Sequence, residues 1–309
     1  MTCARLPSAS VPRLVPSPRP RSLDLPMSPP LPHDVRPLPP AARRPRRRRA
    51  RLAAGTQPVP LIDADRVDGE WTPPDLRLAS ALQRQLLPPV PADLAGVPIA
   101  TAYRPAHHIG GDFYDLVATG DGRVMAVMAD VSGKGMAAAL VMARVAMDVR
   151  RALVGSASPS DALAYVNRTL AARVPDDMFI TAICLEVDLR RRRARAANAG
   201  HVPLFVRSAD GTARTVAAAS GAPLGVLRDE TYAVESVDLR ARDILVLMTD
   251  GVTDALDPSG DPAAGATATV VSRAAPDVHA VVAALVAAVD RRTAGGRPDD
   301  VAVLALEIP

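Results

Sequence analysis

The sequence predicts an α+β fold in which antiparallel sheets pack face to face and helices cover the outside. Two observations carry this prediction. Short strand-like runs follow one another through hairpin-type connections, and the helical segments occur in two clusters along the chain. No internal repeat interrupts this order. We therefore expect a layered sandwich, preceded by an N-terminal segment of different composition.

The expected strands are apolar or alternating runs between turn-forming residues. Two of them are joined through Gly120-Asp121-Gly122, which indicates a hairpin. The expected strands are 97–103, 113–117, 123–131, 179–187, 194–199, 204–207, 232–239, 244–248 and 301–308.

The expected helices show apolar residues at helical spacing. The first covers 75–87 and stops at Pro88-Pro89, and an almost wholly apolar helix covers 136–153. The next begins with Ser158 as its N-cap, and the last covers 278–292.

The first 60 residues differ from the rest in composition. They hold 15 of the 31 prolines and 12 arginines against two aspartates, so their net charge is +10 and that of the remaining chain is −6. Such a segment buries too little apolar surface to offset its ordering entropy. Seven arginines within 43–51 allow contact with nucleic acid or anionic lipid, whereas a solvated linker or an over-extended translation start is the simpler interpretation. We expect a disordered tail at 1–74, a linker helix at 75–89 and a folded domain at 90–309.

Cysteine usage and hydropathy indicate a cytoplasmic protein. Only Cys3 and Cys184 occur, which excludes a disulfide framework. The segment after the arginine run is too short for a secretion signal. No uninterrupted apolar segment reaches the ~20 residues that a membrane-spanning helix requires. Neither a membrane nor nucleic acid is therefore expected as the partner of the folded domain.

Aspartate stands beside glycine or a second aspartate where four expected strands begin or end. These segments are Gly110-Gly111-Asp112, Asp130-Val131-Ser132-Gly133-Lys134-Gly135, Thr249-Asp250-Gly251 and Pro298-Asp299-Asp300. Each alone is more often a plain turn, but carboxylates held at strand ends on glycine-permitted turns can converge on one point. Hard oxygen ligands without a cysteine or histidine cluster favour Mg²⁺ or Mn²⁺ over zinc.

In this order the segments resemble the metal-dependent serine/threonine phosphatases of type 2C (PPM), in particular their bacterial SpoIIE/RsbU-like branch. The resemblance covers roughly residues 76–308, and its motifs are specific in combination. They are Leu82-Gln83-Arg84-Gln85-Leu86-Leu87-Pro88, Tyr103-Arg104-Pro105-Ala106, Gly110-Gly111-Asp112-Phe113-Tyr114-Asp115, Asp130-Val131-Ser132-Gly133-Lys134-Gly135, Asn198-Ala199-Gly200-His201, Gly221-Ala222-Pro223-Leu224-Gly225 and Thr249-Asp250-Gly251-Val252-Thr253-Asp254-Ala255.

The resemblance implies a four-layer αββα sandwich with two divalent cations, Mn²⁺ or Mg²⁺, at one end. The residues that match the family's metal ligands are Asp112, Asp130, the backbone carbonyl of Val131, Asp250 and Asp299. Asp300 adjoins Asp299, so the register of this last ligand stays open. The family often shows Met-Thr after this pair, where the chain has Val301-Ala302.

The implied activity is hydrolysis of phosphoserine or phosphothreonine by metal-activated water, without a protein nucleophile. The implied substrate is a phosphorylated regulatory protein, such as an anti-sigma-factor antagonist in a partner-switching pathway. A catalytically silent module of the same fold, which only docks such a partner, is the alternative; the complete aspartate set favours the enzyme. Lys134, the one lysine of the chain, is either a contact to phosphate or substrate or an exposed cation on a turn.

The remaining candidates for chemistry are interpreted as structural. His201 is either a general acid for the departing serine oxygen or a structural residue that closes a turn; we prefer the second interpretation, and we extend it to His107 and His108. The segment from Cys184 to Arg190 matches the Cys-x5-Arg signature of thiol phosphatases, but it alternates as a strand and lacks a glycine-rich phosphate loop.

The 75–87 helix carries Leu78, Leu82 and Leu86 at positions i, i+4 and i+8. A helix this short is marginal alone in water. Its stripe is therefore expected to pack against the folded domain, a second copy of the chain in a homodimer, or a separate activator. We hypothesise that repositioning this helix changes the geometry of the metal site.

Overall fold

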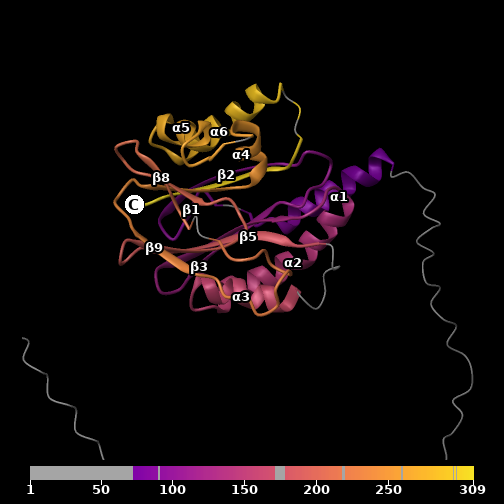
Figure 1. The fold of residues 1–309 in the computed structure, drawn as a ribbon, viewed down its shortest axis with the longest axis horizontal. Coiled ribbons are helices and arrows are strands. Elements are labelled where there is room, and N and C mark those ends of the chain that lie inside the picture. The colour runs from indigo at the N-terminus through magenta and orange to yellow at the C-terminus, as the bar shows by residue number, and fades with distance from the viewer. Residues whose placement is uncertain are drawn as a thin grey trace, which may run out of the picture. The chain divides into compact units, whose positions relative to one another are not determined.

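The computed structural model of the chain describes residues 72–309 apart from positions 90, 171–177, 218–219, 259, 295 and 297. The arginine run at 43–51 and almost all of the expected tail lie outside this part. In the described part, two antiparallel sheets are stacked between two groups of helices (Figure 1). The expected α+β class and the αββα layer order are therefore confirmed.

One sheet has six strands in the order β1-β2-β11-β10-β7-β8, and every neighbouring pair is antiparallel. Its central strands β10 and β11 are fully or almost fully buried. The strands are β1 (Asp93–Leu94), β2 (Val97–Arg104), β7 (Leu204–Arg207), β8 (Ala213–Val216), β10 (Ile244–Met248) and β11 (Val301–Glu307).

The other sheet has five antiparallel strands in the order β3-β4-β5-β6-β9. Its central strands read as near-continuous apolar runs because both of their faces are covered. The strands are β3 (Phe113–Thr119), β4 (Arg123–Val131), β5 (Ile180–Asp188), β6 (Arg193–Ala199) and β9 (Val234–Asp238).

The helices form the two outer layers. Helices α2 and α3 pack their buried residues on the five-stranded sheet, and α4, α5 and α6 pack on the six-stranded sheet. A third apolar cluster fills the space between the sheets. The helices are α1 (Pro73–Leu86), α2 (Met136–Gly155), α3 (Pro159–Leu170), α4 (Asp250–Leu256), α5 (Ala266–Arg273) and α6 (Val278–Arg292).

Four elements were not predicted from the sequence, namely β1, β8, α4 and α5. Each has at most eight residues, and three of them carry few buried apolar side chains, so their local pattern is weak. None of the described helices is long and apolar enough to cross a membrane.

Helix α1 begins at Pro73, two residues earlier than expected, because Thr72 and Asp75 form a capping box. Of the three partners expected for its leucine stripe, the described part of the folded domain does not cover it. Leu78, Leu82 and Leu86 are 61%, 54% and 43% exposed. The side chain that α1 buries against the domain is instead polar Gln83.

Candidate metal centre

Strand pairing brings the four aspartate segments together in two pairs. In the five-stranded sheet, Phe113 lies opposite Ala129, so Asp112 at the start of β3 lies beside Asp130 near the end of β4. In the six-stranded sheet, Met248 lies opposite Val303. The turns that carry Asp250 and Asp299 therefore meet at the same edge.

Thr249 joins the two pairs across the sandwich. Its hydroxyl donates to Asp112 Oδ2 at 2.7 Å and accepts from the backbone N–H of Ala302 at 3.0 Å, and the residue is fully buried. Asp112 itself is 1% exposed. Thr249 thus fixes the direction of a predicted ligand, a role that the sequence analysis missed although Thr249 directly precedes Asp250.

Asp299 and Asp300 have different surroundings. Both carboxylate oxygens of buried Asp300 accept backbone hydrogen bonds, from Ala106 N–H at 2.7 Å and Gly111 N–H at 2.8 Å. Asp299 is half-buried, and one of its oxygens pairs with the Lys134 ammonium at 3.0 Å. Asp300 therefore anchors the loop before Asp112, and this supports Asp299 as the ligand.

Two glycines allow the backbone to approach this cluster closely. A Cβ at Gly111 would lie 2.8 Å from the carbonyl oxygen of Val131 and 3.3 Å from Asp130 Oδ1, both of which are predicted ligand atoms. A Cβ at Gly251 would overlap the backbone carbonyl of Asp300. Any larger residue would push these loops apart.

The carboxylates of the cluster repel one another. Burial and the charge of Asp130 raise the pKa of Asp112 well above its usual value. Burial and the charge of Asp250 raise the pKa of Asp130 to about 7. Burial, Asp254 and Asp299 raise the pKa of Asp250. Such a cluster is held in its charged form only by added positive charge.

The donor set fits divalent cations of the Mg²⁺ or Mn²⁺ type, because it offers several carboxylates and a backbone carbonyl, and no thiolate among the described residues. Within the described residues, no three acidic, histidine or cysteine side chains are already close enough to enclose an ion.

Lys134 is the cation next to this cluster. Its ammonium donates to the backbone carbonyl of Pro298 at 2.8 Å and pairs with Asp299. The hydrogen bond to Asp299 raises the pKa of Lys134. The side chain is 58% exposed, so it can exchange partners.

Gln83 links helix α1 to the glycine loop of the centre. Its Nε2 donates to the carbonyl of Gly110 at 2.6 Å, and its Oε1 accepts from Gly110 N–H at 3.1 Å. These two bonds hold the backbone two residues before Asp112. This role of Gln83 was not predicted from the sequence, because the helix carries two glutamines, Gln83 and Gln85, and no local pattern distinguishes them.

Two of the predicted structural residues are buried as expected. His201 bonds Thr181 through Nδ1 at 2.8 Å, and burial lowers its pKa to about 4, which excludes a cationic general acid at neutral pH. Burial raises the pKa of the Cys184 thiol to about 12, so this residue is no thiolate nucleophile. The side chains of His107 and His108 are exposed on the loop after β2, and their interpretation as turn residues stays a prediction.

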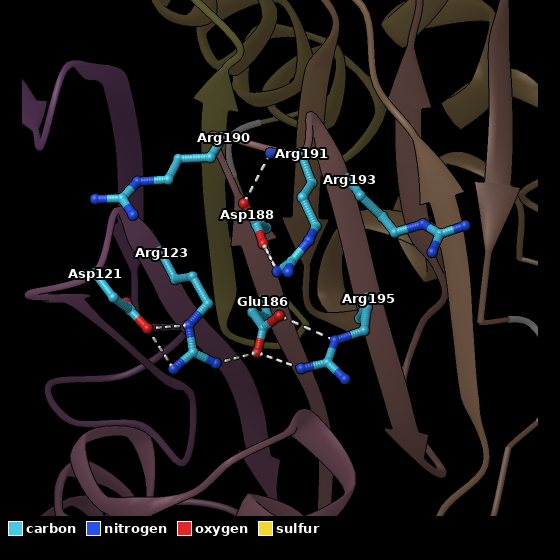
Figure 2. Close-up of a pocket in the computed structure, with 8 residues that line it drawn as sticks. All are labelled: Asp121, Arg123, Glu186, Asp188, Arg190, Arg191, Arg193 and Arg195. Carbon is cyan, nitrogen blue, oxygen red and sulfur yellow. Dashed lines mark hydrogen bonds and ion pairs between the residues drawn. The ribbon is translucent and has the colours of Figure 1, made fainter.

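The end of the five-stranded sheet opposite to the aspartates carries a cleft of about 560 Å³ lined by arginines and acids (Figure 2). Glu186 is almost fully buried and is held by Arg195 through two nitrogens and by Arg123 through one. Asp188 pairs with Arg191. Most acids here are neutralised, so the cleft has the character of a structural ion-pair network.

The chain matches the family model described as Stage II sporulation protein E (SpoIIE) over residues 120–309, more than half of its length. It is 29% identical to the phosphoserine phosphatase RsbU of Bacillus subtilis over 186 residues, which cover 60% of this chain and 55% of the relative. It is also 29% identical to the phosphoserine phosphatase RsbP of the same organism over 185 residues, 58% and 45% of the two chains. The chain thus spans about half the length of these curated relatives.

Solved structures give the same fold. The SiaA-PP2C domain of Pseudomonas aeruginosa superposes with a TM-score of 0.63 at 23% identity, over 76% of this chain and 96% of that domain. The RsbU and RsbW domains of a Mycobacterium tuberculosis protein match with a TM-score of 0.56 at 27% identity, over 68% and 59%. Together with the family match, they show that the chain belongs to the SpoIIE family, in the RsbU-like branch of the type 2C (PPM) phosphatases.

Proposed function

We propose that this chain is a metal-dependent phosphoprotein phosphatase that removes phosphate from serine or threonine of a regulatory protein. One observation carries the proposal: aspartate-bearing turns from both sheets meet at one end of the sandwich, and Thr249 ties them together. A purely structural role does not explain why so many buried acids are left with raised pKa values.

The ligands in this proposal are the carboxylates of four aspartates and one backbone carbonyl. When bound, two divalent cations, Mn²⁺ or Mg²⁺, supply Lewis acidity and an activated water for in-line attack on phosphorus. Thr249 orients Asp112, and Asp300 holds the loop before it. The proposed ligands are Asp112, Asp130, the carbonyl of Val131, Asp250 and Asp299.

Lys134 completes the proposed site on its exposed side. In the structure it neutralises Asp299. A cation bound by the aspartates would take over this role and would leave the flexible ammonium free to bind the substrate phosphate. No protein nucleophile is required, in agreement with the buried thiol of Cys184.

The proposed substrate is a phosphoserine or phosphothreonine protein that resembles an anti-sigma-factor antagonist. Support comes from the relatives RsbU and RsbP, both named phosphoserine phosphatases. The deciding experiment is hydrolysis of para-nitrophenyl phosphate and of such a phosphoprotein by the full chain, with Mn²⁺, with Mg²⁺ and with chelator. Metal-dependent release of phosphate is expected. Binding of the phosphoprotein without any hydrolysis would instead support the silent docking module.

We further propose that the exposed leucines of α1 form a homodimer contact. Three more large apolar side chains, Leu140, Met147 and Val154, are exposed at seven-residue intervals on neighbouring α2. Seven-residue spacing is typical of helices that pack against other helices. The hydrogen bonds from Gln83 to Gly110 connect α1 to the loop before Asp112, so a shift of the helix would move this loop of the proposed metal centre.

Leu82→Arg tests this contact. Since Leu82 is exposed within one chain, the substitution should leave the melting temperature of a monomer nearly unchanged. Sedimentation should show loss of a dimer, and metal-dependent hydrolysis should change with it. An unchanged mass and activity together with a lower melting temperature would show that α1 is only a structural cover.

A further inference from the structure

A cleft lies between helix α1 and the loop that follows β2, and none of the functions above uses it. Its volume is about 420 Å³. Four of its lining side chains are arginine or histidine, and no acidic residue lines it. The lining residues are Arg77, Ser80, Ala81, Arg84, Pro105, His107 and His108.

The described residues do not neutralise the charge of this cleft. Arg77 and Arg84 lie seven residues apart, on one face of α1, and both are exposed. Arg84 donates to the hydroxyl of Ser80 at 3.4 Å. Within the described residues, neither guanidinium has a carboxylate partner. In the arginine-lined cleft of Figure 2, by contrast, Arg123, Arg191 and Arg195 are paired with acids. Unpaired guanidinium groups in a concave site favour the binding of carboxylate or phosphate.

The cleft is next to the metal centre. Its wall at His107 and His108 belongs to the short loop whose two ends, Ala106 and Gly111, both donate hydrogen bonds to Asp300. His108 is four residues from Asp112, at most about 14 Å along an extended chain. A peptide with its phosphorylated residue at the aspartates can therefore place a side chain a few positions away in the cleft.

We infer that this cleft is a substrate subsite that binds acidic side chains within a few residues of the phosphorylated serine or threonine. The inference rests on the proposed phosphatase function. The aspartates of the proposed metal site repel the acidic side chains of a substrate. Arg77 and Arg84 in the neighbouring cleft attract these side chains. The imidazoles of His107 and His108 and the hydroxyl of Ser80 add hydrogen-bonding groups that can orient a carboxylate.

The test compares two phosphoserine peptides of equal length, one with aspartate and glutamate around the phosphoserine and one with asparagine and glutamine. Each rate is normalised to hydrolysis of para-nitrophenyl phosphate by the same preparation of the full chain with Mn²⁺. The wild type is expected to show a KM roughly fivefold lower for the acidic peptide, the scale of two exposed ion pairs, and to lose this preference with added salt. Arg77→Gln with Arg84→Gln should abolish it, and Arg77→Lys with Arg84→Lys should keep most of it.

The matched control removes the same charge from the distant arginine cleft, by Arg190→Gln with Arg193→Gln (Figure 2). This variant should keep the preference. An equal loss in both double variants would overturn the inference, since it would reflect the overall charge of the protein. An unchanged preference in the Arg77/Arg84 variant would overturn it as well.

A second readout separates this inference from the proposed activity. Fluorescence anisotropy measures binding of the labelled acidic peptide to the chain in chelator. If no ester is hydrolysed with any metal, the proposed function fails, and the binding measurement alone decides about the cleft. Weaker binding by the Arg77/Arg84 variant than by the Arg190/Arg193 variant supports the subsite; equal binding refutes it.

Discussion

Both ends of the five-stranded sheet carry buried acidic side chains. Arginines compensate their negative charge at one end but not at the other. At one end, Asp112 and Asp130 lie among other aspartates, and their pKa values are raised. At the other end, roughly 23 Å away along β4 at ~3.3 Å per residue, Glu186 is clamped by arginines. There the backbone N–H and guanidinium of Arg191 lower the pKa of Asp188.

The difference separates structural charges from functional ones. An acidic side chain that is paired with an arginine is already neutralised within the protein and requires no added cation. Acidic side chains gathered beside one exposed lysine would be stabilised by an added cation, and for this reason we propose them as the metal site.

Substitution at the aspartate end should abolish activity. Asp112→Asn removes one proposed ligand charge, and Asp250→Asn removes another. Each should lower metal-dependent hydrolysis by at least about a hundredfold, or ~2.7 kcal/mol in the barrier. The matched control is Asp188→Asn at the arginine end, which should keep its activity. Full activity of both ligand variants at limiting Mn²⁺ would contradict the assignment.

Metal should stabilise the protein in a pH-dependent way. The pKa of Asp130 is raised to about 7, so a bound proton stabilises the metal-free fold at low pH, and this contribution is lost as the pH rises through 7. Mn²⁺ should replace it, adding about 2.7 kcal/mol at a hundredfold excess over Kd. The rise in melting temperature on adding Mn²⁺ should therefore be larger at pH 8 than at pH 5.5. An equal rise at both values would argue against carboxylate ligands.

Substitution at the arginine end should affect stability alone. Glu186→Gln leaves two guanidinium groups without their charged partner and should lower the free energy of unfolding by about 2 kcal/mol. Hydrolysis per folded molecule should stay unchanged. Asp238→Asn, which breaks the exposed pair with Arg193, should change stability by no more than about 0.5 kcal/mol. Denaturant unfolding measures both values. A loss of hydrolysis per folded molecule in Glu186→Gln would contradict the purely structural role of the arginine end.

Loosening the link between α1 and the aspartate end should have the smallest effect. Gln83→Ala removes both hydrogen bonds to Gly110 and should lower activity about tenfold, or ~1.4 kcal/mol. The apparent Mn²⁺ affinity should fall with it, because Gly110 precedes the loop of Asp112. Gln85→Ala, an exposed neighbour on the same helix, is the control. Equal effects of the two substitutions would mean that Gln83 acts only through helix stability.

The sequence by itself determined the layered α+β class, most strands to within two residues, and the turns that carry Asp112, Asp130 and Asp250. These features depend on local periodicity and on turn chemistry, which neighbouring residues specify. Family resemblance added the ligand roles, which spacing alone leaves undefined.

Only the tertiary structure decided which side chains meet across the chain. Thr249 and Asp112 are 137 residues apart and are joined because the two sheets stack. Asp299 and Asp300 are neighbours with the same chemistry, and they differ because the backbone N–H groups of Ala106 and Gly111 both point at Asp300. For α1 the leucine pattern left three possible partners open, and the structure shows that a pair of hydrogen bonds from Gln83, not the leucines, fixes how the helix sits on the domain.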